Sequence, residues 1–300
     1  MKKFFKWVGI IIGSLLGLLV LVFLGLAMKG NLMLKKTYDV RVETLFIPTD
    51  AEAIARGEHW VKAECIGCHG DDLSGGPFFV APFATVNAKN LTTGKGGVGS
   101  EFSSEDWIRV FRYGVGPDGN SILIMPSHAF RFLSDSDLGD IIAYLKVAPP
   151  VDNELSEPKF NLLGKALLGA GAFGDSVVIA ETINNNPIDP SYPAAGVTPE
   201  YGEYLVNVSG CHDCHGVDLS GGKSADPSAI PAPNLTAGGE LVAWKEADFI
   251  KAIRTGLTPT NRQLDPAQMP WEHYKNFSDD ELKAIWAYLD SLPQLETTIP

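Results

Sequence analysis

Cysteine is scarce in this sequence: only four occur among 300 residues, and they form two C-x-x-C pairs. An isolated C-x-x-C pair is typical of a zinc half-site or a redox dithiol. Here each pair is followed directly by histidine, the flanks repeat, and no further cysteine pair is present, which disfavours both chemistries. No cysteine remains for a disulfide or a separate thiolate-ligated centre.

Acidic residues are absent from the first 36 positions, and basic residues are scarce in the rest of the chain. The first 36 positions hold six lysines, whereas the remaining positions hold 18 basic against 36 acidic residues, a formal charge of −18. Such a surface would repel phosphate backbones. We therefore expect no nucleic-acid partner, and a docking partner with a basic or mainly apolar face.

The two cysteine pairs open a repeated motif, Cys65-Ile66-Gly67-Cys68-His69-Gly70 and Cys211-His212-Asp213-Cys214-His215-Gly216. Two thiols three positions apart each bond one vinyl group of haem, and the imidazole that follows reaches the iron. The sequence therefore predicts two covalently bound haem c groups, one attached at Cys65 and Cys68 and the other at Cys211 and Cys214. His69 and His215 are the predicted iron ligands on one side of each haem.

Methionine is also scarce: five occur, of which three are the initiator and two beside the apolar N-terminal segment. The other two, Met125 and Met269, each precede proline and lie 56 and 54 residues after His69 and His215. A thioether is a soft ligand that favours reduced iron. An isolated methionine is more often core filler, but the repeated placement predicts Met125 and Met269 as the second iron ligands.

For three further histidines the sequence gives weaker support for a role at the iron. His128 competes for the first iron, but Glu272 takes its place in the second copy, so we expect a surface or supporting role. His59 is too close in sequence to His69 to reach the opposite face of the haem, and we expect it to be exposed. His212, which stands between the cysteines of its own motif, should point away from the iron and be exposed.

Other polar features recur in both halves at near-constant spacing: Asn90-Leu91-Thr92 with Asn234-Leu235-Thr236, and Arg112 with Arg254. The asparagine motif fits either a polar loop against the haem or a plain turn. The arginines fit either a contact with a haem propionate or a solvated cation in the last turn of a helix. Glycine pairs in 72–76 and 218–222 suit a chain that folds tightly against a flat ring.

Residues Trp7 to Met28 form a run of 22 residues without a charge. A helix of that length spans roughly 33 Å, enough for a hydrocarbon core of about 30 Å. A cleaved signal peptide is the alternative, because Gly25 and Ala27 offer small residues before a cut. The run is longer than the usual apolar core of a signal peptide, so we predict a retained transmembrane anchor.

The repeats divide the chain into an anchor and two similar halves. The predicted boundaries are 1–36 for the anchor, 37–50 for a linker, 51–147 for the first domain, 148–197 for an inter-domain linker and 198–295 for the second domain. The apolar stretch Leu162–Phe173 in the inter-domain linker is too short to span a membrane.

Each half is predicted to contain three main helices and no strand. Their expected ranges are 51–64, 104–113 and 138–147 in the first half and 199–208, 246–255 and 282–292 in the second. Serine followed three positions later by an acid predicts capping at the start of each last helix. The first and last helices should cross at Gly57 and at Gly202, where the missing side chain permits close approach.

The order C-x-x-C-H-G-x-x-L-S-G-G, N-L-T, M-P and a final S-D-x-[DE]-L-x-x-I-x-A-Y-L helix resembles class I cytochromes c. It looks most like the membrane-bound cytochrome c subunits of periplasmic alcohol and gluconate dehydrogenases, over about 51–147 and 198–293. The resemblance implies two tandem all-α domains, each with crossed terminal helices, a haem in its core and low-spin His/Met iron. It also implies a bacterial inner-membrane protein with periplasmic haem domains. This chain has two attachment motifs where those subunits typically have three.

A six-coordinate iron has no open position for a substrate, so the expected role is single-electron transfer and not catalysis. The expected partners are a membrane or periplasmic oxidoreductase, such as a quinol-oxidising complex, a terminal oxidase or a dehydrogenase. A cytochrome subunit within a periplasmic dehydrogenase complex is one alternative. A di-haem peroxidase is another; it needs an open iron position with acid/base groups beside it, for which His128 is the only hint.

Overall fold

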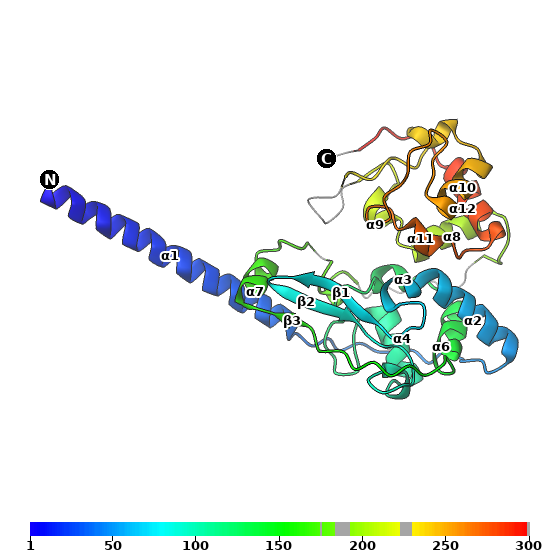
Figure 1. The fold of residues 1–300 in the computed structure, drawn as a ribbon, viewed down its shortest axis with the longest axis horizontal. Coiled ribbons are helices and arrows are strands. Elements are labelled where there is room, and N and C mark those ends of the chain that lie inside the picture. Colours follow the sequence, from blue (N-terminus) through cyan, green and yellow to red (C-terminus); the bar gives the residue numbers. More distant parts are fainter. Residues whose placement is uncertain (175, 184–192, 223–229, 299–300) are drawn as a thin grey trace.

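The computed structural model describes residues 1–174, 176–183, 193–222 and 230–298. Helix α1 (Lys2–Leu34) contains the whole uncharged run and projects from a body made of two halves (Figure 1). It is long and apolar enough to cross a membrane, and most of its leucine, isoleucine and valine side chains are exposed. These are the properties expected of a helix whose surroundings are lipid or of a signal sequence.

The first half has the three predicted main helices, with two short helices between them. Asp50 begins the half as the N-cap of its first helix, because its side chain accepts a hydrogen bond from the amide of Ala53 at 2.9 Å. The helices are α2 (Ala51–Glu64), α3 (Ile66–His69), α4 (Ser104–Tyr113), α5 (Ser127–Phe130) and α6 (Asp135–Leu145), with a 3-10 turn η1 (Val98–Ser100).

The second half repeats this order. Ser278 and Glu281 form a reciprocal capping box at the start of its last helix, as the sequence predicts. The helices are α8 (Pro199–Val208), α9 (His212–His215), α10 (Glu246–Thr255), α11 (Trp271–Tyr274) and α12 (Asp279–Ser291), with a 3-10 turn η3 (Glu240–Ala243). The prediction of a mainly helical protein with two domains of one kind is confirmed.

The first and last helices of each half cross at the predicted glycines. A Cβ atom on Gly57 would collide with the carbonyl oxygen of Asp140, and one on Gly202 would collide with that of Ala284. The two backbones are therefore closer at each crossing than any larger residue permits. These crossings hold the start of each half, which carries the attachment motif, against its end.

A small antiparallel sheet is an addition that the sequence did not predict. Its strands are β1 (Gly76–Ala81), β2 (Ala84–Ala88) and β3 (Lys159–Phe160), in the order β1-β2-β3. The last strand comes from the predicted inter-domain linker, which also supplies α7 (Leu162–Gly169) and a 3-10 turn η2 (Ile179–Glu181). Much of the predicted linker is therefore part of the first half.

Helix α7 packs antiparallel against the last turns of α1 (Figure 1). A Cβ atom on Gly30 would collide with the carbonyl of Lys165, and one on Gly169 would collide with that of Leu26. Ala27 is only 3% exposed in this contact. The end of the apolar helix is thus built into the first half through small residues.

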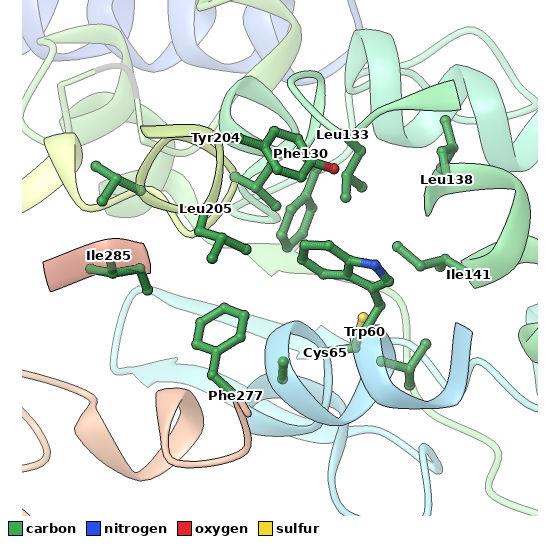
Figure 2. Packing of buried hydrophobic residues seen from close by; sticks show 14 of the residues in the cluster. Trp60, Cys65, Phe130, Leu133, Leu138, Ile141, Tyr204, Leu205, Phe277 and Ile285 are labelled. Atoms are coloured by element: carbon green, nitrogen blue, oxygen red, sulfur yellow. The ribbon is translucent and has the colours of Figure 1, made fainter. Parts of the chain in front are cut away.

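The two halves share one continuous hydrophobic core. The ring of Trp60 in α2 lies edge-on to Tyr204 of α8 at 6.1 Å and to Phe277 at 6.5 Å between centroids. Figure 2 shows these rings together with Leu205 and with Phe130, which contribute from opposite halves. Edge-to-face rings add to the stabilisation that burial provides. The halves are therefore packed against each other through a shared core and are not independent domains joined only by a linker.

Candidate functional site

The first attachment motif lies at the end of α2 and is shaped by α3. Because α2 ends at Glu64 and α3 begins at Ile66, Cys65, Cys68 and His69 are held on a single turn. The Nδ1 atom of His69 donates a hydrogen bond to the carbonyl of Lys89 at 2.7 Å. This bond fixes the tautomer whose Nε2 carries a lone pair, which is what an iron ligand needs. Burial lowers the pKa of His69, so the ring stays neutral and able to ligate.

The second motif repeats this arrangement on α9. Nδ1 of His215 donates to the carbonyl of Pro233 at 2.8 Å, and its side chain is buried at 6% exposure. Burial again lowers the histidine pKa. Both predicted iron-binding histidines therefore have the same orientation and the same neutral form.

A cavity of 1380 Å³ brings the residues of the first predicted site together. Cys65, Cys68 and His69 line it, and so does Met125, which is 56 residues away in the sequence. The rest of its lining is largely apolar and aromatic and includes Val86, Leu91, Val98, Phe102, Trp107, Phe111 and Phe130. A haem has the flat, mainly apolar shape that such walls accommodate, so the donor set and the cavity fit the group that the motif predicts.

The Met125 segment is held in a strained turn. Ile124 has a φ of 69°, a left-handed conformation that is costly for a β-branched residue. Its amide donates to the carbonyl of Val177 at 3.1 Å, and the amide of Met125 donates to Leu123 at 2.9 Å. The brace at Val177 comes from the predicted inter-domain linker, which gives part of that segment a role in presenting Met125 to the cavity.

Trp107 was not singled out from the sequence, but it is a functional candidate at the first site. Its side chain is 2% exposed and lines the cavity, and its indole Nε1 has no hydrogen-bond partner among the described residues. A buried indole N–H without an acceptor is costly, so an acceptor on a bound group would satisfy it. Phe249 is the corresponding residue of α10 and has no such donor. Only an alignment of α4 with α10 could have shown this difference.

Glu64 is a second group that sequence reasoning missed. It lines the cavity directly before Cys65 and accepts a hydrogen bond from the hydroxyl of Ser209 in the other half at 2.8 Å. Burial raises its pKa to about 8. Burial therefore favours the neutral form of this carboxyl group, which carries no full negative charge beside the attachment motif.

In the second half, the residues that correspond to Met125 form a different turn. The amide of Met269 donates to the carbonyl of Asp265 at 2.9 Å, and its half-buried side chain packs against the shared core. The preceding residue, Gln268, does not have the positive φ of Ile124. Ligation of the second iron by Met269 stays a prediction.

The repeated asparagine motif forms a turn in both halves. The Asn90 side chain accepts from the amide of Thr92 at 2.9 Å and donates to the carbonyl of Val151 at 2.7 Å. Asn234 accepts from the amide of Thr236 at 2.8 Å and donates to a carbonyl after α12, that of Leu295, at 2.9 Å. Of the two interpretations, the structure favours a turn that ties the loop to the chain beyond the last helix.

Those turns are joined to the loops that follow the attachment motifs. Leu73 and Leu219 have positive φ values of 60° and 59°. Their carbonyls accept from the amides of Leu91 at 2.9 Å and of Leu235 at 2.8 Å. The D-L-S-G-G and N-L-T repeats are thus two parts of one scaffold that surrounds each histidine.

Arg112 and Arg254 make contacts within the protein that the sequence did not suggest, and a contact with a haem propionate stays a prediction. Arg112 donates to the carbonyls of Arg131 and Leu133 at 2.5 Å and pairs with Asp135 at 2.8 Å. Arg254 likewise binds the carbonyl of Lys275 and pairs with Asp279 at 2.7 Å. Arg112 therefore connects α4 to the start of α6, and Arg254 connects α10 to the start of α12.

Two histidine predictions are corrected by hydrogen bonds, one between the halves and one within the second half. His59 is not a free surface residue: its Nε2 lies 2.9 Å from Glu281 of α12. His212 is only half-buried, with Nδ1 3.2 Å from the carbonyl of Gly216. No local pattern could indicate the pairing of His59 with Glu281, because the two residues are 222 positions apart.

Each half places the helix after its methionine against the attachment motif of the other half. Nε2 of His128 in α5 lies 2.8 Å from Asp213, between the cysteines of the second motif. In return, the ring of His273 in α11 lies against Gly67 of the first motif. His128 therefore links the first half to the second attachment motif. Its role at the iron, including the acid/base role that a peroxidase would need, stays a prediction.

Comparison with known families defines the class of protein. The sequence model of the family "Cytochrome c" matches residues 199–293, and that of "Cytochrome C oxidase, cbb3-type, subunit III" matches residues 52–145. The chain therefore contains two cytochrome c domains, one in each half. With their two C-x-x-C-H motifs, these domains imply haem c binding and a role in electron transport.

The similar curated proteins are mainly subunits of dehydrogenases. The chain is 27% identical over 80% of its length to the gluconate 2-dehydrogenase cytochrome c subunit of Pantoea cypripedii, and covers 59% of it. It is 25% identical over 81% of its length to the alcohol dehydrogenase (quinone) cytochrome c subunit of Gluconacetobacter polyoxogenes, and covers 57% of it. The chain thus spans less than three fifths of these relatives.

Proposed function

We propose that this chain is a membrane-anchored di-haem cytochrome that carries single electrons between a membrane or periplasmic oxidoreductase and a second redox partner. The observation that carries the proposal is the convergence of His69 and Met125 on the cavity that Cys65 and Cys68 line. Haem c supplies one-electron chemistry when bound, and iron with six ligands leaves no place for a substrate. The chain is accordingly a carrier and not itself an enzyme.

The residues of the first site have separate roles in this proposal. Cys65 and Cys68 hold the group covalently, and His69, oriented by the Lys89 carbonyl, ligates the iron. Met125 would be the second iron ligand and, as a soft donor, would favour the reduced state. The apolar walls exclude water, which also favours the less charged reduced state. In the second site, Cys211, Cys214, His215 and Met269 take these roles.

The proposed location is the bacterial inner membrane, with one transmembrane pass and both haem domains in the periplasm. The packing of α7 on α1 supports a retained anchor, because Ala27 and Gly30 are buried in the folded body. A signal peptidase requires an extended and accessible segment at its cut. N-terminal sequencing of the purified protein is the direct check: the retained anchor predicts a chain that includes the residues of α1.

The proposed partners are a quinol-oxidising complex, a terminal oxidase or a dehydrogenase. The dehydrogenase partner has additional support, because the similar proteins from Pantoea and Gluconacetobacter are named as cytochrome c subunits of dehydrogenases. On that reading the chain is one subunit of a larger complex. Co-purification of a dehydrogenase with the tagged chain distinguishes it from an independent carrier.

A redox titration combined with carbon monoxide tests the ligand assignment. The wild-type holoprotein should show two haems that do not bind the gas when reduced. Met125→Leu should open one iron, so that one of the two haems binds carbon monoxide and its reduction potential falls. Met28→Leu is the matched control, because Met28 is 66% exposed on α1 and does not line the cavity. If Met125→Leu behaves like the control, Met125 is not the ligand.

A further inference from the structure

The first half carries an apolar surface beside the anchor, here named the apolar shelf and defined as residues 78–83 and 162–174. Residues 73–88, which contain the β1–β2 hairpin, have no charged side chain. Phe78 and Val80 on β1 are 48% and 69% exposed, and Leu162 and Leu163 on α7 are 53% and 48% exposed. Grouped exposure of large apolar side chains marks a surface that contacts something other than water.

The hairpin and α7 form one surface. A Cβ atom on Gly164 would collide with the carbonyl of Phe83 in the hairpin turn, so the two backbones touch. The rings of Phe83 and Phe173 stack with centroids 5.9 Å apart. Asn161 joins them further, because its side chain donates to the carbonyl of Pro82 at 3.1 Å. Two segments that are about eighty positions apart in the sequence are thus held as a single unit.

The position of the apolar shelf is fixed relative to the transmembrane run. Gly169, at the end of α7, contacts Leu26, which lies two residues inside the uncharged run that ends at Met28. The antiparallel packing places the start of α7 near the lysines that follow the run, and its end beside the run itself. If α1 crosses the bilayer, the end of α7 is at the level where hydrocarbon meets head groups.

The backbone after α7 is suited to that level. The amide of Ala172 donates to the carbonyl of Leu167 at 3.0 Å, and that of Gly174 donates to Gly171 at 3.1 Å. Backbone groups near hydrocarbon must find partners within the protein, and these do. Lys29, Lys35 and Lys159 are exposed around the shelf, in contrast to the acidic remainder of the chain. Lysines at this level favour anionic lipid head groups.

We propose that the apolar shelf inserts into the periplasmic leaflet of the bilayer that α1 crosses, and so fixes the first haem site at the membrane surface. This rests on the proposed function only in requiring that α1 is a retained anchor. The cavity of the first site is lined by Asn31 and Lys35 from the end of α1 and by Phe78 from the shelf. The first site is therefore the one next to the membrane, where an electron donor within or on the bilayer would reach it.

Site-directed spin labelling tests this placement. In the holoprotein all four cysteines are bonded to haem, so one introduced cysteine is the single free thiol. Val80→Cys and Leu163→Cys report on the shelf, Leu18→Cys in the middle of α1 reports on lipid, and Val217→Cys, at a position 91% exposed in the second half, reports on water. Each nitroxide-labelled full-length protein is placed in nanodiscs of phosphatidylcholine and phosphatidylglycerol. Broadening of its spectrum by oxygen is compared with broadening by a water-soluble nickel chelate.

Labels at Val80 and Leu163 should be broadened less by the chelate than the label at Val217 and should keep their broadening by oxygen, at a shallower depth than the label at Leu18. The label at Val217 should retain broadening by the chelate. If the labels on the shelf are broadened by the chelate as much as the label at Val217, while the label at Leu18 is not, the shelf does not insert. The proposal of a retained anchor would still hold in that case. If the label at Leu18 is itself open to the chelate, the anchor is wrong and the shelf proposal falls with it.

Discussion

The hydroxyl of Tyr204 is the polar link between the two halves whose removal has the clearest expected cost. It donates to the carboxylate of Asp137 at 2.5 Å and accepts from the amide of Ser134 at 3.0 Å, both at the start of α6. Tyr204→Phe removes this oxygen with little change in shape. The Ser134 amide then loses its acceptor, and Asp137 keeps, among the described residues, the side-chain donors Trp60 and the Ser134 hydroxyl.

A hydrogen bond to a charged group contributes about 1.5–3 kcal/mol, and a buried amide without an acceptor adds a penalty. Because the Asp137 carboxylate retains two donors, we expect a loss of about 2 kcal/mol for Tyr204→Phe. For a cooperative unit of about 200 residues this corresponds to a fall in melting temperature of roughly 4–8 °C. The shared core predicts that both halves lose stability together, although the substitution lies in only one of them.

Thermal unfolding of the holoprotein, followed by the haem Soret band and by tryptophan fluorescence, measures this effect. Tyr201→Phe is the matched control: Tyr201 lies one turn earlier on α8, and its hydroxyl makes no hydrogen bond within the described ranges. The control should melt like wild type. Equal melting temperatures for Tyr204→Phe and Tyr201→Phe would refute the reasoning, and so would loss of stability in the second half alone.

Two further predictions concern the helices that meet at the centre of the molecule. His59→Gln removes an ion pair in which the hydrogen bond to Glu281 raises the histidine pKa above 6.5; burial opposes ionisation of Glu281, but bonding to His59 lowers its pKa below 4.5. Between pH 4.5 and 6.5 the free energy of unfolding of the wild type should therefore be about 1 kcal/mol larger than that of the variant. This difference should disappear as the pH rises through the pKa of His59 or falls through that of Glu281. Denaturant unfolding at a series of pH values measures it. Gly202→Ala should cost about 1–3 kcal/mol because its Cβ meets the Ala284 carbonyl, whereas Gly76→Ala, with open space around it, should not collide with any atom. Equal unfolding midpoints for the two glycine variants would contradict the close helix crossing.

Local patterns in the sequence predicted most of the helical framework. The ranges 51–64, 104–113, 199–208 and 246–255 agree with the observed helices, because the signals that set them are local: the caps at Asp50 and Ser103, and the glycines that end α4 and α10. The last helices begin a turn earlier than the apolar pattern suggested. Their first turns are acidic residues that stabilise a helix N-terminus without contributing to the apolar stripe.

The features that the sequence did not predict depend on contacts between distant segments. The pairing of His59 with Glu281 and the unsatisfied indole of Trp107 have no local signature, since both follow from how the elements pack. The strand β3 contains only two residues, which is too short for an alternating pattern to be recognised. The apolar stretch from Leu162 was recognised, but its partner, the end of α1, could be found only from the three-dimensional arrangement.

The lining of the first cavity has a consequence for how the protein matures. It includes Asn31 at the end of α1, Met125 from the middle of the first half, and Asp213 and Cys214 from the motif of the second half. The lining of the cavity is thus complete only after more than two thirds of the chain has been made and the second half has docked. If Cys65 and Cys68 bind haem as proposed, the second half closes part of the wall around a haem that is attached to the first half.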